Sequence, residues 1–135
     1  MGTSDPTEEF AVRFGAATTA AFVEAELAAL GSDYGGNGYT TLAQAEDLGE
    51  ALAIDRGDRL LDLGSGCGWP GLYLAARHGC EIVTADPVAG GAKASVARSA
   101  RDGLERRHLA VVAMGAQLPF RSRSFDAIVH TDVMC

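Results

Sequence analysis

The sequence predicts an α/β fold in which parallel strands alternate with helices. Short apolar runs suited to buried strands occur at residues 59–63, 81–86 and 108–113, and segments with the helical spacing of apolar residues separate them. Each connection has the length of a β-α-β crossover, and two such crossovers in succession place their strands in parallel in one sheet. A glycine-rich turn after the first run marks the passage from strand to helix.

Two helices are predicted before the loop at residues 31–41. Asp5 and Pro6 start the first helix, as its N-cap and its first helical residue. An alanine-rich amphipathic segment at residues 22–30 forms the second helix, and Gly31 ends it. Together these helices are expected to cover one edge of the fold.

Residues 31–41 are predicted to form a loop, because four glycines and two tyrosines follow one another there without periodicity. Aromatic side chains between glycines can close over a ligand, and a plain connector with two packed tyrosines fits the pattern equally well. Thr41 and Gln44 then form a capping box, which starts a helix predicted to end at Gly57. The buried stripe of this helix comprises Ala45, Leu48 and Leu52.

The stretch of residues 59–75 reads as a buried strand, a tight turn and the start of a helix. Glycine occupies three alternate positions after the strand, Gly64, Gly66 and Gly68, and Pro70 opens the helix. Glycines there remove the side chains that would keep a ligand away from the backbone, and the helix behind them presents free N–H groups. The turn is therefore a predicted site for an adenosine-containing cofactor.

The spacing of the glycines argues against a nicotinamide dinucleotide. Counted from Gly64, the dinucleotide fingerprint G-x-G-x-x-G requires its third glycine at the position that Trp69 occupies. The sequence instead reads D-x-G-x-G-x-G from Asp62, and a second acid, Asp86, ends the next apolar run. An acid about 20 residues after a glycine turn is placed to accept hydrogen bonds from both ribose hydroxyls.

The remaining elements follow the same alternation. Gly79 ends the helix after the turn, residues 81–86 form the second strand, and Pro87 breaks it. The next helix is predicted at residues 89–107, before the third strand at 108–113. The predicted inner face of this helix comprises Ala92, Val96, Ala100 and Leu104.

The composition argues against several classes of protein. The net charge is -7, since 18 acidic residues outnumber 11 Lys and Arg, and a nucleic-acid binder needs a basic face. No apolar stretch reaches the roughly 18 residues of a membrane-spanning helix, and the amino terminus lacks a signal-peptide h-region. Three cysteines without metal-ligand spacing predict a reduced, cytoplasmic protein with no structural zinc.

Asp62, the glycine turn and Asp86 resemble the first two motifs of the class I S-adenosylmethionine-dependent methyltransferases. Residues 114–135 add a third similarity, a Leu-Pro-Phe turn before a Phe-Asp pair and a fourth strand from Phe125 to about Thr131. The resemblance implies a Rossmann-like parallel sheet of strand order 3-2-1-4, with helices on both faces and an amino-terminal helical cap. It also implies methyl transfer from S-adenosylmethionine, with S-adenosylhomocysteine as the product.

The chain is expected to form one structural domain, in which the resemblance distinguishes two regions. Residues 1–58 would form the amino-terminal helical cap with a cofactor-covering loop, and residues 59–135 the cofactor-binding α/β core. Met114 departs from the family pattern, because many relatives carry an acid there that receives the adenine amino group. No catalytic base is assigned, and a lone histidine at a strand end is more simply a packed or partly exposed residue. The cofactor-binding residues that the resemblance implies are Tyr39, Asp62, Gly64, Ser65, Gly66, Cys67, Gly68, Asp86, Pro87, Gly115, Ala116, Gln117, His130 and Thr131.

The methyl acceptor is expected to be a small molecule, and neither a metal, a nucleic acid nor a membrane is expected as a partner. Because members of the resembled family continue with further strands, the chain is expected to be a methyltransferase truncated after its fourth strand. That outer strand would present unpaired backbone groups and aliphatic side chains, which predicts self-association near residues 125–135. Two alternatives stay open: a cofactor-binding module without turnover and, less favoured, a fragment of an NAD-linked oxidoreductase.

Overall fold

A computed structural model describes residues 8–9, 11–12, 19–35 and 38–133. Its elements are α2 (Ala20–Leu30), α3 (Leu42–Leu52), β1 (Arg59–Leu63), α4 (Gly71–His78), β2 (Glu81–Asp86), α5 (Ala89–Arg101), β3 (His108–Val112) and β4 (Ala127–Val129). The predicted helix start at Asp5 and Pro6 lies outside the described residues.

The four strands form one parallel sheet in the order β3-β2-β1-β4, which confirms the predicted order. Within it, Leu61 of β1 lies opposite Val83 of β2 and Ile128 of β4, and Val83 lies opposite Leu109 of β3. Side chains at paired positions of neighbouring strands point to the same face, so these four apolar residues share one face. The carboxyl ends of the strands form the edge at which open α/β sheets bind their ligands.

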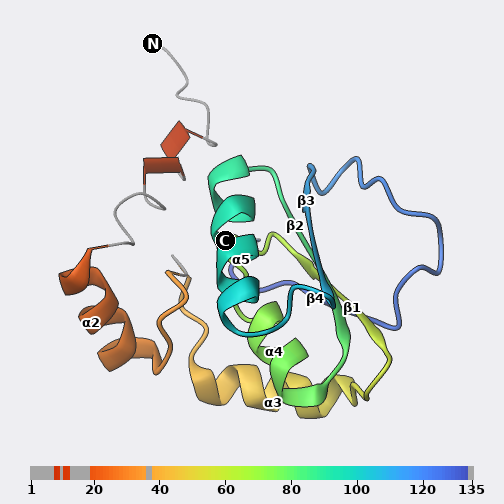
Figure 1. The fold of residues 1–135 in the computed structure, drawn as a ribbon, viewed down its shortest axis with the longest axis horizontal. Helices are drawn as coiled ribbons and strands as arrows, with labels where there is room; N and C mark the ends of the chain where they lie inside the picture. The colour runs from red at the N-terminus through yellow and green to blue at the C-terminus, as the bar shows by residue number, and fades with distance from the viewer. Residues whose placement is uncertain (1–7, 10, 13–18, 36–37, 134–135) are drawn as a thin grey trace.

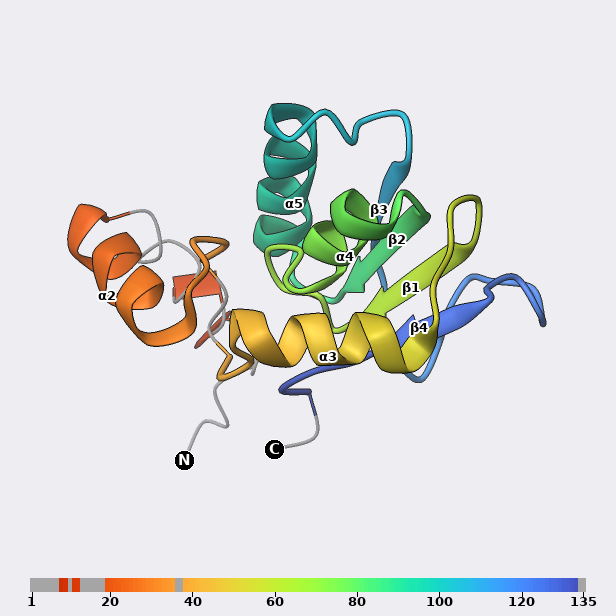
Figure 2. The same cartoon turned by 90° about the horizontal axis from the view of Figure 1, so that it is seen from below.

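Both crossover helices lie on the other face of the sheet (Figure 1). β1 connects to β2 through α4 and β2 to β3 through α5, and two right-handed crossovers that step in the same direction pass over the same face. α3 packs against α4 (Figure 2). The opposite face leaves Leu109 and Ile128 59% and 53% exposed, so the second helical layer that the resemblance implies is not present among the described residues.

The hydrophobic core lies between the sheet and α4. Leu60 of β1 and Ile82 of β2 are fully buried and belong to one cluster with Leu72 and Leu74 of α4. Burying a leucine or isoleucine side chain contributes about 1.5–3 kcal/mol, so these few residues hold α4 on the strands. Because α4 follows the glycine turn directly, this packing also fixes the position of the turn.

The predicted ends of the amino-terminal helices are confirmed in part. Gly31 ends α2 with a φ of 76°, and Thr41 and Gln44 form the predicted capping box of α3. The prediction that α3 continues to Gly57 is wrong, because the helix ends at Leu52. Ala53 takes the left-handed conformation there, with a φ of 49°. The next residue, Ile54, is buried in the hydrophobic core, and its packing sets the path of the chain after the helix.

The predictions for α5 need two corrections. The helix ends at Arg101 instead of residue 107, and Gly103 two residues later has a φ of 71°. The predicted inner face is wrong at Val96, which is 50% exposed, and at Ala100, which is exposed, whereas Ala92 is half-buried and Leu104, beyond the end of the helix, is buried in the core. The buried residues of the helix are Gly91, Ser95 and Ser99.

The inward face of α5 differs from the prediction by one position because small polar side chains suit a close approach to the sheet. The hydroxyls of Ser95 and Ser99 donate to the carbonyls of Ala92 and Val96 at 2.8 and 3.0 Å. Buried serines satisfied by their own helix need no partner elsewhere. In an alanine-rich helix the contrast between faces is weak, and apolar spacing alone chose the wrong one.

β4 is shorter than the predicted strand and includes neither Phe125 nor Thr131. The Phe125 ring instead packs edge-to-face on Phe120, with centroids 5.0 Å apart. The Asp126 carboxylate accepts the Arg59 N–H at 2.8 Å, which ties the start of β4 to the start of β1. None of the described helices has the length and apolar character needed to cross a bilayer.

Candidate functional site

The glycine turn follows β1 at the carboxyl edge of the sheet. Gly64, Gly66 and Gly68 have positive φ angles of 71°, 52° and 100°. Residues other than glycine rarely adopt this region of backbone conformation. A Cβ added to Gly68 would also lie 2.5 Å from a methyl carbon of Leu72. The Gly64 N–H donates to the Ala85 carbonyl at 2.7 Å, so the turn is anchored on β2.

The Asp86 carboxylate lies directly beside this turn. Its Oδ2 accepts the Gly66 N–H and its Oδ1 accepts the Val88 N–H, both at 2.8 Å. A carboxylate has about four acceptor positions, so each oxygen keeps capacity for another donor. The structure thus adds to the predicted ribose contact a second role, in which Asp86 ties the turn to the segment after β2.

Asp62 caps α4 although it lies nine residues before the bonded N–H. Its Oδ2 accepts the Gly71 N–H at 2.8 Å, while the N-cap residue Pro70 makes no side-chain hydrogen bond. Its Oδ1 is buried without a hydrogen-bond partner. Burial, with a further contribution from the charge of Asp86, raises the pKa of Asp62 to about 8, against the lowering effect of the Gly71 hydrogen bond.

Because of Asp62, we expect the free energy of unfolding to fall as the pH rises from about 4 to 8. The pKa of this carboxyl is about 8 in the folded protein, against an ordinary value of 3.8, so the folded protein binds more protons than the unfolded chain in this window. One group contributes a slope of at most about 1.4 kcal/mol per pH unit. Asp62→Asn keeps an oxygen for the Gly71 N–H and cannot ionise, so urea unfolding at several pH values should show this slope removed.

The control for this experiment is Asp47→Asn, which removes an exposed carboxyl on α3. It should unfold with the parent's dependence on pH. If Asp62→Asn and the parent lose stability equally steeply between pH 5 and 8, the buried carboxyl is not the source of the effect.

A cavity of about 370 Å³ lies where β2 and β3 end, beside Pro87. It is lined by Pro87, Val112, Ala113, Met114, Gln117 and Pro119. Gly115 and Ala116 lie exposed in the adjoining turn, which the Gln117 N–H closes on the Met114 carbonyl at 2.9 Å. The structure therefore brings the predicted residues Pro87 and Gln117 together, in a cavity with an apolar lining that suits a flat base.

The other predicted residues have different surroundings. The Tyr39 side chain is 82% exposed and lines a separate cavity of about 510 Å³ with Asp47 and Leu48. At the end of β4, His130 is exposed and Thr131 is half-buried. A part for these three residues in cofactor binding stays a prediction.

Ser65 and Cys67 are buried within the turn. Burial, followed by the charges of Asp86 and Glu26, raises the pKa of the Cys67 thiol to about 11. Since the thiolate is the nucleophilic form of cysteine, this thiol is not activated for catalysis near neutral pH.

Sequence reasoning missed the residues that follow Thr131. A Cβ on Gly64 would lie 2.5 Å from a methyl carbon of Val133, so this part of the chain lies against the turn. The carboxylate of the preceding Asp132 accepts hydrogen bonds from Tyr39 and Thr40. The one available signal was position, because these residues directly follow a strand that ends beside the turn.

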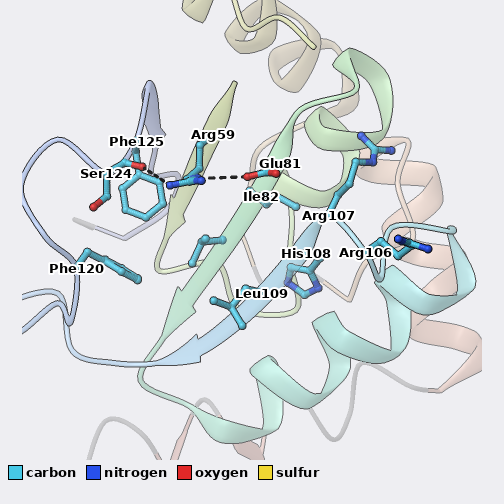
Figure 3. Close-up of a pocket in the computed structure, with 11 residues that line it drawn as sticks. Arg59, Glu81, Ile82, Arg106, Arg107, His108, Leu109, Phe120, Ser124 and Phe125 are labelled. Carbon is cyan, nitrogen blue, oxygen red and sulfur yellow. Dashed lines mark hydrogen bonds and ion pairs between the residues drawn. The ribbon is translucent and has the colours of Figure 1, made fainter. Parts of the chain in front are cut away.

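A further depression of about 380 Å³ lies at the opposite, amino-terminal edge of the sheet (Figure 3). Arg59 and Glu81, which begin β1 and β2, form an ion pair there with the side-chain atoms 3.3 Å apart. The rings of Phe120 and Phe125 also line it, with Phe125 beside Arg59 (Figure 3). No residue of the glycine turn lines this depression. The depression is therefore distinct from the predicted cofactor site at the carboxyl edge of the sheet.

The parallel sheet of order 3-2-1-4, with a glycine turn and a strand-end acid at its carboxyl edge, defines a Rossmann-like cofactor-binding fold. The family model described as a methyltransferase domain matches residues 61–135, more than half of the chain. The chain therefore belongs to the methyltransferase-domain family, which confirms the resemblance seen in the sequence.

Solved structures agree with this fold. A SAM-dependent methyltransferase from Thiobacillus denitrificans in complex with S-adenosyl-L-homocysteine is 24% identical, with a TM-score of 0.60 over 67% of this chain and 36% of its own. A SAM-dependent methyltransferase from Geobacter sulfurreducens, also in complex with S-adenosyl-L-homocysteine, is 29% identical, with a TM-score of 0.51 over 54% of this chain and 29% of its own.

The 4+2 cyclase SpnF is 25% identical, with a TM-score of 0.56 over 67% of this chain and 34% of its own. This chain thus spans about a third of the length of these three solved structures. None of the curated proteins matches it.

Proposed function

We propose that this chain binds S-adenosylmethionine between the glycine turn, Asp86 and the loop after β3, as part of an enzyme that methylates a small molecule. The observation that carries the proposal is the position of the Asp86 carboxylate, whose Oδ2 lies 2.8 Å from the Gly66 nitrogen. Membership of the methyltransferase-domain family supports it, as does the S-adenosyl-L-homocysteine complex of the 29% identical structure.

The residues present fit an adenosine cofactor. Asp86 keeps acceptor capacity for two ribose hydroxyls, because each of its oxygens receives one backbone N–H. The cavity beside Pro87 and Gln117 offers apolar packing and backbone groups for the base, in place of the acid that Met114 replaces. The Oδ1 of Asp62 is buried beneath the turn without a partner, and because the pKa of this carboxyl is raised to about 8, it offers an O–H donor there at neutral pH.

S-adenosylmethionine would supply a methyl group on a positively charged sulfonium, which is already an activated leaving group. The protein then has to align the acceptor and exclude water, rather than provide a nucleophile of its own. The protonated thiol of Cys67 is consistent with this division of labour. No side chain is assigned as a general base.

Calorimetric titration with S-adenosylhomocysteine and with NAD tests the proposal. S-adenosylhomocysteine should bind at one site and NAD should give no heat of binding, because the third glycine of the dinucleotide fingerprint is replaced by Trp69. Binding of NAD alone would favour an oxidoreductase. Binding of S-adenosylmethionine without its conversion across a panel of small acceptors would favour a binding module, or other chemistry on this fold.

We also propose that the protein works in the cytoplasm as one structural domain, with a helical cap at residues 1–58 and an α/β core at residues 59–135. A further proposal is that copies of this chain associate through β4. Within the described residues β4 pairs with β1 on one side, and its other edge has no strand beside it. Ile128 on β4 is 53% exposed on the same sheet face as Leu109. An unpaired edge next to exposed aliphatic side chains is a template for pairing with another chain.

Sedimentation velocity at rising protein concentration is expected to show a dimer or larger species for the parent. Ile128→Lys should shift the distribution toward the monomer, because charged residues on an edge strand oppose pairing. Leu27→Lys, at a leucine of α2 that is 48% exposed, should leave the distribution unchanged. A parent that stays monomeric at high concentration would contradict the association.

A further inference from the structure

Trp69, the single tryptophan of the chain, stands directly after the glycine turn and is 6% exposed. Its indole N–H donates to the Thr40 carbonyl at 2.9 Å, a buried hydrogen bond between residues 29 positions apart. Its ring packs between Tyr34 and Tyr73, with centroids 5.0 and 5.6 Å away. Trp69 therefore joins the residues before α3 to the turn through one polar contact, with Thr40, and one aromatic contact, with Tyr34, whereas Tyr73 lies on α4.

Residues 38–41 are also held from the other side of the glycine turn. The Asp132 Oδ2 accepts the N–H groups of Tyr39 and Thr40 at 3.0 and 3.3 Å and the Thr40 hydroxyl at 2.9 Å. The neighbouring Val133 lies against Gly64. Residues 38–41 thus span the space between Trp69, at the end of the turn, and the segment after β4, and Thr40 is bonded to both.

A third group of contacts secures Tyr34, the aromatic neighbour of Trp69. The Arg98 guanidinium lies 3.8 Å from the centre of the Tyr34 ring and forms ion pairs with Asp33 and Asp102 at 2.9 and 2.7 Å. Burial is the main reason that the pKa of Tyr34 is raised to about 12. The Trp69 ring therefore rests on a tyrosine that α5 holds in place.

We infer that Trp69 is a positioning residue for the cofactor: its indole N–H holds residues 38–41 beside the glycine turn and thereby slows release of the bound ligand. This inference rests on the proposed function. Thr40 is 8% exposed and sits between two tethers, so a ligand in the turn has a fixed backbone wall on this side. Without the Trp69 hydrogen bond, residues 38–41 remain attached at Asp132 alone. We therefore expect this backbone wall to open locally more often, while the sheet stays folded.

Trp69→Phe tests the inference, because phenylalanine keeps an aromatic ring between the two tyrosines and lacks the N–H. In the ligand-free protein, amide hydrogen exchange of residues 39–41 should accelerate while exchange in β1 and β2 stays at the parent rate. With S-adenosylhomocysteine, the dissociation rate measured by surface plasmon resonance should rise about 5- to 10-fold, the loss expected for one hydrogen bond, with the association rate not reduced. Asp132→Ala, which removes the opposite tether, should change both readouts in the same direction.

The matched control is Tyr73→Phe. It removes a side-chain hydrogen bond of similar length, from the Tyr73 hydroxyl to Glu46 at 2.9 Å, within the same aromatic group and without a bond to residues 38–41. Its exchange and dissociation rates should equal those of the parent. If Trp69→Phe leaves exchange of residues 39–41 and the dissociation rate unchanged, or accelerates exchange equally in β1 and β2, the residue has a general structural role and the inference is wrong.

Failure of the proposed function would look different. A parent protein that does not bind S-adenosylhomocysteine rejects the cofactor assignment, whatever the variants do. The tether is then judged on hydrogen exchange in the ligand-free protein, where unchanged exchange of residues 39–41 in Trp69→Phe overturns it.

Discussion

Asp86→Ala is expected to weaken binding of S-adenosylhomocysteine by at least about 10-fold and to destabilise the fold as well. Binding loses a charged acceptor of two ribose hydroxyls, each worth about 1.5–3 kcal/mol. Stability falls because the N–H groups of Gly66 and Val88 lose their acceptors, at a cost of about 1–3 kcal/mol for the buried Val88 donor and less for the half-buried Gly66 donor. Calorimetry measures the affinity and urea unfolding measures the stability.

Asp126→Ala separates the two effects. The Asp126 carboxylate also accepts a backbone N–H at a strand end, that of Arg59 at 2.8 Å, but it lies at the amino-terminal edge of the sheet. This variant should lose about 1 kcal/mol of stability and keep the parent affinity. An Asp86→Ala protein that is folded and binds S-adenosylhomocysteine as tightly as the parent would refute the ribose assignment.

Gly66→Val is expected to abolish detectable binding. The Gly66 φ of 52° lies in the left-handed region, where a β-branched side chain is strongly disfavoured, so the turn must change its path. The Gly66 N–H also holds the Asp86 Oδ2, so a displaced turn moves the ribose acceptor with it. Because the displaced turn no longer lets the ligand approach its backbone or the ribose acceptor, titration calorimetry should find no saturable heat.

The control for this substitution is Gly57→Val. Gly57 has a φ of 91° and no atom within 4 Å of an added Cβ, so valine there meets backbone strain without a collision or a ligand. We expect Gly57→Val to be less stable than the parent and to bind S-adenosylhomocysteine with parent affinity. Retained binding by a folded Gly66→Val protein would show that the cofactor is seated elsewhere.

Local signals explain which elements could be predicted from the sequence. β2 was predicted with its observed bounds because Gly79 and Pro87 terminate the segments around it. The capping box of α3 was predicted because it joins residues only three positions apart. The end of α3 was mispredicted because Gly57 was the local stop signal, whereas the helix ends at Leu52 and the packing of Ile54 in the core decided the path.

The candidate site was predictable to a similar extent. The order of Asp62, the glycine turn and Asp86 along the chain predicted a cofactor-binding crevice, because those residue types carry its chemistry wherever they occur together. The double use of Asp86 and the unpartnered oxygen of Asp62 were not visible in the sequence. Both depend on which backbone N–H groups the folded turn presents to each carboxylate.

By itself, the sequence determined the alternation of strands and helices, the glycine turn and the family, because these follow from dihedral preferences and spacing within a few residues. The tertiary structure alone decided which face of α5 is buried and which residues surround the turn. Thr40 is bonded to Trp69 across 29 positions and to Asp132 across 92. Contacts of that separation leave no periodic trace in the sequence, because they arise only when packing of the sheet and its helices brings distant segments together.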